Sequence, residues 1–242
     1  MTLDEVLEAL LFRRSFRRRF ARGERAALGI APADEQDLAA LDLDELERAA
    51  RLACRGVLER SHRGVGSLLD AFPRTIDAWR DAHPGAELDE LAAEFADSEA
   101  FRAWRPLSAA EPPGPSSEDT FRVFCEQTLG PETGLLARAE CAAATVRAIV
   151  VNPRPSFAIP SFLRIAPRGL YAIVSRNGTD ILVAALNGRF VTGPLTPLLA
   201  AILRADEPGA AAARLDAAHP DAAHPDAGMA TANELRALGL IP

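Results

Sequence analysis

The chain has 242 residues, of which 48% are hydrophobic and 25% are charged, and its formal net charge at pH 7 is −7. This composition excludes a wholly disordered or fibrous chain and is typical of a folded protein with one large domain or two small ones. All 27 basic residues are arginines, because the sequence contains no lysine. A Schiff-base or nucleophilic lysine is therefore excluded as well.

The location of the protein is indicated by features that the sequence lacks. No apolar run approaches the roughly 20 residues that cross a bilayer, and the longest strongly apolar pieces are Ala148–Val151 and Ile181–Leu186. The first ten residues, MTLDEVLEAL, carry three acids and no basic segment, which argues against a secretory signal. Cys54, Cys125 and Cys141 are far apart and form no Cys-x-x-Cys pattern, so we expect buried thiols. We therefore expect a cytoplasmic protein without membrane partners.

Charge divides the chain into three segments. Residues 1–30 carry seven arginines and four acids, residues 31–150 carry 12 arginines and 23 acids, and residues 151–242 carry eight arginines and seven acids. Segments of such different charge are typical of parts with different tasks. Prolines between 151 and 160 break the helical pattern. We predict an α+β fold with a helical domain at 1–150, a linker at 151–160 and a small domain at 161–242.

The first segment is predicted to be helical. Apolar residues from Leu3 to Phe20 recur at helical spacing with arginines around them, which predicts one amphipathic helix with an arginine-covered face. Asp42 is placed to cap a second helix, and Ser116 with Asp119 has the form of a capping box for a later one. Further helical stripes cover residues 68–82, 88–95, 97–104, 119–126 and 135–150.

After the linker the hydrophobic period becomes that of strands. β-Branched and aromatic residues fill four runs, which are Phe162–Ile165, Leu170–Ser175, Asp180–Leu186 and Arg189–Val191. The pairs Asn177-Gly178 and Asn187-Gly188 stand between runs and predict tight hairpins, because both residues accept the positive φ of a type I′ turn. We therefore expect a small antiparallel meander.

Three helices are expected after the meander. Their predicted features are Thr196 as a cap before Pro197, a short helix at 210–217, and a capping box of Thr231 with Glu234 that opens a helix ending at Gly239. Leu235 and Leu238 are expected to point inward. The pentapeptide DAAHP occurs twice in tandem at 216–225, and no mechanism is assigned to it. Strands followed by three helices predict a winged-helix-like module.

Catalytic patterns are absent from the sequence. His83, His219 and His224 precede prolines in turns, and His62 has no visible partner, so a metal or general-base role is disfavoured for all four. The sequence has no nucleophile elbow, phosphate-binding loop, dinucleotide fingerprint or His-Glu-x-x-His motif. We expect no catalytic residue, cofactor or metal in this chain.

The arginines between Arg13 and Arg25 leave two interpretations open. Dense arginine can hold phosphates, and a winged helix elsewhere in the chain fits a DNA-binding regulator. The C-terminal segment is nearly neutral, however, and its last helix offers only Arg236, whereas a DNA reader concentrates basic residues on its recognition element. The favoured interpretation is that these arginines form ion pairs with the acidic middle segment, and nucleic acid is not the expected partner.

The meander predicts a peptide-binding edge. An exposed edge strand can accept an extended peptide as an added strand, with main-chain bonds giving affinity and flanking side chains giving selectivity. The last strand, Arg189–Thr192, and the last helix, Leu235–Leu238, are expected to form the groove. This hypothesis needs no basic surface.

Several stretches of the sequence resemble one family. They are LLFRRSFRRRFARGERAALGI (10–30), LDLDEL (41–46), LLDAFPRTIDAW (68–79), LAAEFADSEAFRAWRP (91–106) and SSEDTFRVFCE (116–126). These stretches resemble the partner proteins of multinuclear nonheme iron oxidases in ribosomally made peptide natural-product pathways, including the methanobactin and thiaglutamate types. The segment 10–46 also resembles the small helical subunit of extradiol ring-cleavage dioxygenases, which leaves a dioxygenase subunit as a further alternative.

The resemblance implies a function. A member of this family is a noncatalytic partner that forms a heterodimer with a separate oxidase, and that oxidase holds the iron and modifies Cys or Asp of the precursor peptide. The C-terminal domain would be similar to the winged-helix recognition elements that bind leader peptides between a strand and the last helix. The residues at those positions here are Arg189, Phe190, Val191, Thr192, Leu235, Arg236 and Leu238. The insertion at 218–228 departs from the family's pattern.

Four aromatic residues of the helical segment are candidates for contacting the oxidase. Trp79 and Phe95 fall on apolar stripes and are expected in the core. Phe101 and Trp104 stand near a proline-rich loop with Arg102 and Arg105 beside them, and aromatic residues and arginine dominate interface energetics. The predicted oxidase interface is therefore Phe101, Arg102, Trp104 and Arg105.

Overall fold

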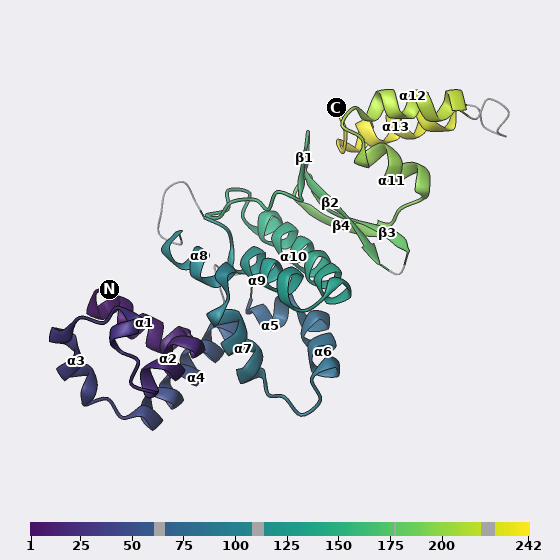
Figure 1. Ribbon diagram of the computed structural model, residues 1–242. Coiled ribbons are helices and arrows are strands. Elements are labelled where there is room, and N and C mark those ends of the chain that lie inside the picture. Colours follow the sequence, from purple (N-terminus) through teal and green to yellow (C-terminus); the bar gives the residue numbers. More distant parts are fainter. Residues whose placement is uncertain (61–65, 108–113, 177, 219–225) are drawn as a thin grey trace.

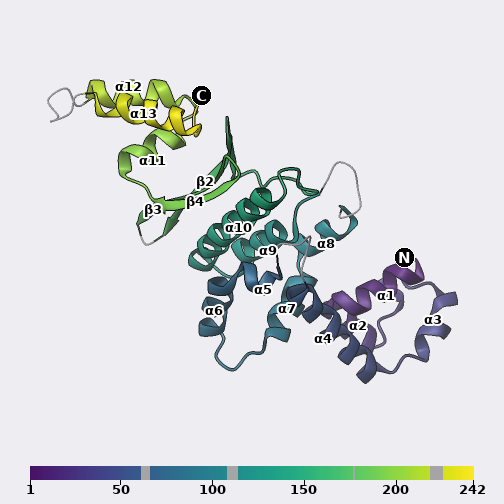
Figure 2. The same ribbon diagram turned by 180° about the vertical axis from the view of Figure 1, so that it is seen from behind.

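The structure is a computed structural model of the whole chain. It describes all residues except 61–65, 108–113, 177 and 219–225, and it leaves the side chains of residues 36, 105–107 and 176 undescribed. An N-terminal lobe of helices leads into a central helical body, which is followed by an antiparallel sheet and three C-terminal helices (Figure 1). The two termini lie on opposite sides of the central body, as the view from behind also shows (Figure 2).

The N-terminal lobe has its own hydrophobic cluster. Its elements are α1 (Leu3–Phe12), α2 (Arg14–Ala21), a 3₁₀ turn η1 (Ala26–Leu28), α3 (Pro32–Ala39) and α4 (Leu43–Glu59). Val6 and Leu10 of α1 pack with Phe16 and Phe20 of α2. The Asp42 carboxylate accepts hydrogen bonds from the first amides of α4, which confirms the predicted cap.

The prediction of one long arginine-covered helix is wrong, because the chain turns at Arg13 (φ −113°, ψ 99°). The turn folds α2 back so that Phe16 faces the apolar side of α1. The buried Arg17 guanidinium donates to the carbonyls of Leu10 and Leu11, both at 3.0 Å, and so satisfies the end of α1. Two short helices therefore replace one long stripe.

The central body is a set of helices around a cluster of aromatic rings. Its elements are α5 (Leu68–Ala71), α6 (Pro73–Ala82), α7 (Leu88–Asp97), α8 (Glu99–Leu107), α9 (Ser117–Thr128) and α10 (Pro131–Val151). Phe95 is fully buried and its ring lies 5.0 Å from that of Phe121 at 89°, an edge-to-face contact. Phe95 and Trp79 are core residues, as predicted. The predicted cap Ser116 is confirmed, because its Oγ accepts from the Asp119 amide.

The sheet has four antiparallel strands in sequence order. They are β1 (Arg164–Ala166), β2 (Gly169–Arg176), β3 (Thr179–Leu186) and β4 (Arg189–Pro194). Asn187 (φ 51°) and Gly188 (φ 71°) close the β3–β4 hairpin with the predicted positive φ values. Asn177 of the other Asn-Gly pair lies outside the described residues. An α+β chain with an antiparallel meander is confirmed.

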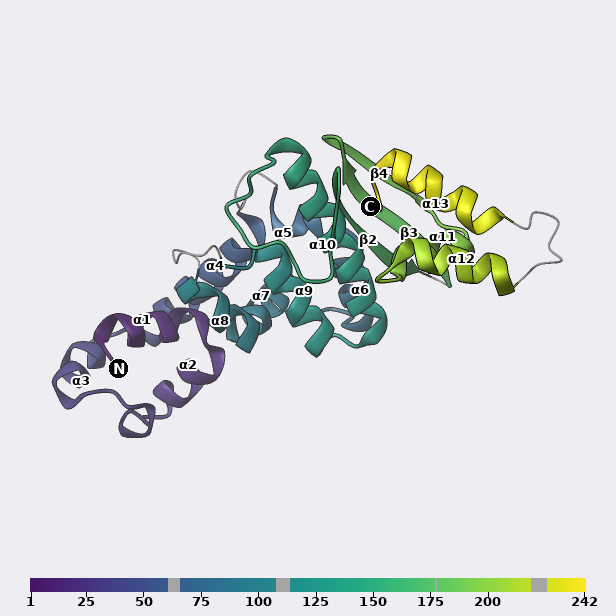
Figure 3. The ribbon, with the colours of Figure 1, turned by 90° about the horizontal axis from the view of Figure 1, so that it is seen from above.

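Helices cover both faces of the sheet (Figure 3). Leu170, Ala172 and Val183 pack against Ala142 and Val146 of α10 on one face. The alternate residues pack on the other face against the C-terminal helices, and they include Tyr171, Leu182, Ala184 and Leu186. Strands buried on both faces have continuous apolar runs, which explains the sequence Ile181–Leu186. The hydrophobic packing of the sheet thus extends across residue 150 into the helical body.

The C-terminal helices are α11 (Pro197–Arg204), α12 (Pro208–Ala218) and α13 (Ala227–Leu238). The predicted cap Thr196 and the C-terminal Gly239 (φ 76°) are confirmed. The capping box at Thr231 is wrong, because α13 begins four residues earlier. Asp216 of α12 accepts from the amides of Gly228 (2.6 Å) and Met229 (2.9 Å) and stabilises this earlier start. Most of the DAAHP repeat, 219–225, lies outside the described residues.

Candidate peptide-binding and docking surfaces

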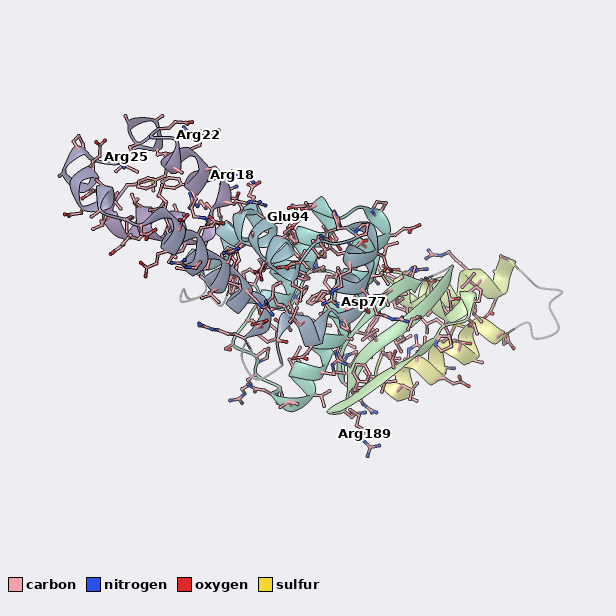
Figure 4. All side chains as sticks on the ribbon, turned by 90° about the horizontal axis from the view of Figure 1, so that it is seen from below. Arg18, Arg22, Arg25, Asp77, Glu94 and Arg189 are labelled. Atoms are coloured by element: carbon pink, nitrogen blue, oxygen red, sulfur yellow. The ribbon has the colours of Figure 1, made fainter. Side chains whose placement is uncertain are left out.

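Strand β4 forms one edge of the sheet. It pairs with β3 on its inner side, and no described strand lies on its outer side. Phe190 and Val191 are each 39% exposed, and Arg189 and Thr192 are exposed as well. The predicted residues Arg189–Thr192 are thus accessible, and Arg189 projects from the strand end (Figure 4).

The hydrogen-bonding direction of β4 follows from its hairpin. A two-residue turn makes Leu186 and Arg189 a bonded pair, and bonded pairs alternate along an antiparallel ladder. The amide of Leu195 donates to the carbonyl of Asp180 at 2.7 Å, which keeps this alternation beyond the strand. The main-chain groups of Phe190 and Thr192 therefore point away from β3, toward the open side of the sheet.

The side chains of β4 alternate between the two faces. Phe190 stands opposite Ala185 and Thr192 opposite Val183, and both partners face α10. Val191 stands opposite Ala184, which faces the C-terminal helices. The four β4 residues therefore share one edge but not one groove, and only Arg189 and Val191 are on the α13 side.

Helix α13 contributes less to a groove than the sequence predicts. Leu235 is buried in the cluster beneath the sheet, so its side chain is not offered to a ligand. Leu238 is 55% exposed, which corrects the prediction that it points inward. Arg236 donates to the carbonyl of Pro242 and to Asn233, both at 2.9 Å. Of the three residues predicted on α13, Leu238 and Arg236 are therefore accessible and Leu235 is not.

The predicted oxidase interface lies on α8. Phe101 is only 2% exposed and packs on the rings of Phe95 and Phe12, so its predicted interface role is corrected to core packing. Trp104 is half-buried and its Nε1–H donates to the carbonyl of Pro115 at 3.0 Å. Arg102 is exposed. The side chain of Arg105 lies outside the described part of the chain.

Three arginines between Arg13 and Arg25 form ion pairs with acids, and one of these acids, Glu47, belongs to the acidic middle segment. Arg17 pairs with Glu47 of α4 at 2.9 Å, and Arg19 and Arg22 pair with Glu24 at 2.8 and 2.9 Å. The hydrogen bond from Arg19 lowers the pKa of Glu24. A hollow of about 230 Å³ between α2, α4 and α7 is lined by further arginines and acids, among them Arg14, Arg51, Glu87 and Glu90. Arg18 and Arg22 are exposed on the N-terminal lobe (Figure 4), whereas Arg25 is half-buried and its guanidinium carbon lies 5.1 Å from the ring centre of Phe20.

The three cysteines are buried, as predicted. Burial raises the pKa of Cys54 to about 11 and also raises the pKa values of Cys125 and Cys141. A thiol with a raised pKa stays protonated at neutral pH and is a poor nucleophile.

His83 stacks on Trp79 and lies 2.9 Å from its carbonyl oxygen. Among the residues that the structure describes, no group of three or more His, Cys, Asp or Glu side chains is placed to hold a metal ion.

An apolar hollow that the sequence did not predict lies between α10 and the sheet. Its floor includes Leu170 and Ala185, its wall includes Ile149 and Val150, and residues 153–159 of the linker close one side. Its volume is about 330 Å³. The lining comes from segments far apart in the chain, and only the folded structure brings them together.

No protein-family model, curated protein or solved structure matches the chain. Within the described ranges, no helix has the length and apolar character needed to cross a membrane.

Proposed function

We propose that the chain is a noncatalytic partner protein that binds a ribosomally made precursor peptide and presents it to a separate iron-dependent oxidase. The oxidase holds the iron and modifies a Cys or Asp of the peptide. The observation that carries the proposal is the open edge of β4, where Phe190 and Thr192 turn their main-chain groups outward. An extended peptide satisfies these groups by adding a fifth strand.

The C-terminal sheet and helices act as a winged-helix-like recognition element in this proposal. The leader peptide lies along Arg189–Thr192. Val191 and Leu238 contact its side chains on the α13 face of the sheet, and Phe190 contacts its side chains on the α10 face. Leu235 supports the sheet from below. Because α10 packs on the same sheet, a peptide at β4 is held in a fixed place relative to the helical body. Such tethering raises the effective concentration of the peptide at the oxidase.

The oxidase docks on the helical body in this proposal, at the outer surface of α8. Arg102 and Trp104 carry the contact, with Arg105 beside them. An exposed arginine next to a half-buried tryptophan is a pairing typical of interface hot spots. The expected assembly is a heterodimer.

A DNA-binding regulator remains the competing function and is less well supported. Arg204 holds Asp180 through a bond of 2.6 Å, and Arg236 holds the carbonyl of Pro242. Arg204 and Arg236 would both have to leave these partners to contact phosphate. Binding to duplex DNA with a steep salt dependence would favour the regulator.

The first test is whether an iron oxidase and a short Cys- or Asp-containing peptide are encoded beside this protein, and the second is co-purification with that oxidase followed by binding of that peptide. Thr192→Pro removes an outward N–H while leaving the bonded pairs of β4 in place, since proline is tolerated at a strand edge. Thr192→Val is the matched control because it keeps the N–H. The proposal expects Thr192→Pro to weaken peptide binding on the order of tenfold. Equal peptide affinity of the two variants, or no complex with the oxidase, would overturn it.

A further inference from the structure

The floor of the apolar hollow between α10 and the sheet is in register with a residue of the proposed peptide edge. Strand register places Ile165, Leu170, Ala185 and Phe190 in one row across all four strands. Residues directly opposite in antiparallel strands share a face, so the whole row is on the α10 side. Leu170 and Ala185 form the floor of the hollow, and Phe190 extends the same row to the edge strand.

The outer members of the row remain uncovered. Ile165 is 81% exposed and Phe190 is 39% exposed, although the middle of the row is buried. The wall residue Ile159 of the linker is exposed too. The two ends of this row are exposed apolar side chains, and a cavity adjoins its middle. Such a surface is suited to bind an apolar group of another molecule.

Charge restricts what that molecule can be. Residues 141–205 carry seven arginines and a single acid, Asp180, although the chain as a whole has a net charge of −7. Asp180 is paired with Arg204 at 2.6 Å. Arg168 lines the hollow, although its guanidinium donates to the carbonyl of Ala237 at 2.9 Å, and the exposed Arg154 stands between two prolines that also line the hollow. An occupant of this surface therefore meets arginines and no free carboxylate within the described part of 141–205.

We propose that the hollow bounded by Leu170, Ala185 and Ile159 binds a large apolar side chain of an acidic peptide, the same peptide that adds to β4. This inference rests on the proposed function and names the class of peptide. The peptide leaves the edge strand at its Arg189 end, crosses Phe190 and places the apolar side chain in the hollow. Its carboxylates lie near Arg154.

The size of the hollow agrees with this occupant. Small-ligand pockets have volumes of roughly 300–1,000 Å³, and a hollow of about 330 Å³ is at the lower end of this range. One leucine, methionine or phenylalanine side chain with its flanking backbone fills such a space. Burial of one such side chain contributes about 1.5–3 kcal/mol, which is roughly a 10- to 100-fold change in affinity.

The experiment is selection of a displayed library of random 12-residue peptides on the purified full-length chain, followed by anisotropy titration of the enriched peptides. Ile159→Glu puts a carboxylate at the mouth of the hollow on an exposed residue. Leu52→Glu is the matched control, since Leu52 is an exposed leucine of α4, away from the sheet. Arg154→Glu is a second variant that changes charge without changing the apolar lining.

The inference expects enriched peptides that combine acidic residues with a large apolar one. It expects Ile159→Glu to weaken their binding at least tenfold, Arg154→Glu to weaken it several-fold, and Leu52→Glu to leave it unchanged. Peptides that bind Ile159→Glu as tightly as the wild type but lose affinity for Thr192→Pro would overturn the hollow and leave strand addition intact. Failure to enrich any peptide would contradict the proposed function itself.

Discussion

The guanidinium carbon of Arg122 lies 4.9 Å from the ring centre of Phe162, and this cation–π contact joins helix α9 to the segment that leads into β1. Arg138 of α10 approaches the same ring at 5.8 Å. Together with the apolar contacts between α10 and β2, this contact fixes the sheet on the helical body. The two parts are therefore expected to unfold as one cooperative unit.

Loss of the Phe162 ring should destabilise the whole chain. Phe162→Ala removes a cation–π contact and apolar packing, and the expected cost is about 2 kcal/mol in the free energy of unfolding. Phe190→Ala is the control, because that ring is on the exposed edge and its removal should change stability by less than about 0.5 kcal/mol. Urea unfolding followed by circular dichroism measures both. Equal stabilities of the two variants would show that Phe162 does not anchor the sheet.

The carboxylate of Glu126 should make the free energy of unfolding fall as the solution becomes acidic. Its burial acts to raise its pKa, but hydrogen bonds from Arg138 and Arg122 outweigh this and lower the pKa below the ordinary value of 4.5. A carboxyl group whose pKa is lower in the folded state stabilises the fold above its unfolded pKa, and this stability is lost as the pH falls through the folded pKa.

Glu126→Gln should therefore be less stable than the wild type at neutral pH, and the difference should shrink as the pH falls below about 4. Glu132→Gln, at the exposed start of α10, should keep the wild-type acid profile. Thermal unfolding between pH 7 and pH 3 measures this dependence. A constant difference between Glu126→Gln and the wild type across that range would contradict the assignment.

Glu140 of α10 caps the N-terminus of α6, because the N-cap residue of α6, Phe72, has no side chain that can do so. Its carboxylate accepts from the amides of Arg74 (2.9 Å) and Thr75 (3.0 Å) and from the Thr75 hydroxyl (2.7 Å). Glu140→Ala leaves the amide and hydroxyl of the buried Thr75 without this partner and should cost about 1–2 kcal/mol. Glu132→Ala on the same helix should cost much less. Denaturant unfolding of the pair distinguishes the cap from a general effect of lost charge.

Gly169 should tolerate no side chain. A Cβ at this position would lie 1.8 Å from the carbonyl oxygen of Ala185, whereas a Cβ at Gly193 on β4 meets no atom within 4 Å. Gly169→Ala should therefore separate β2 from β3 and cost more than about 3 kcal/mol. Gly193→Ala should be nearly neutral. If Gly169→Ala is as stable as Gly193→Ala, the register of β2 with β3 is wrong.

Local signals made several elements predictable from the sequence. The cap at Asp42, the turn at Asn187-Gly188 and the terminator Gly239 depend on a few neighbouring residues, and all three are confirmed. The break at Arg13 and the early start of α13 depend on contacts with distant segments, which a periodic pattern does not contain. Asp216, for example, stabilises α13 from another helix.

Helix α10 contributes to two hydrophobic cores, one in the helical body and one beneath the sheet. Ala137 and Cys141 pack into the aromatic cluster, whereas Ala142 and Val146 pack on the sheet. Small residues on several sides of a helix give no single apolar stripe, so the sequence predicted a helix but not its second partner. The exposed edge at Arg189–Thr192 was predictable, since it needs only strand order. The hollow was not, because its lining comes from four separate stretches of chain.

The most direct test of strand addition is amide hydrogen exchange, measured by NMR on the full-length chain with and without a peptide enriched from the displayed library. Val191 is in a bonded pair with Ala184, whereas the amides of Phe190 and Thr192 face outward and should exchange quickly in the free protein. The account predicts that the peptide slows exchange at Phe190 and Thr192 at least about tenfold and changes Val191 little. A bound peptide that leaves these two amides unprotected would contradict strand addition at β4.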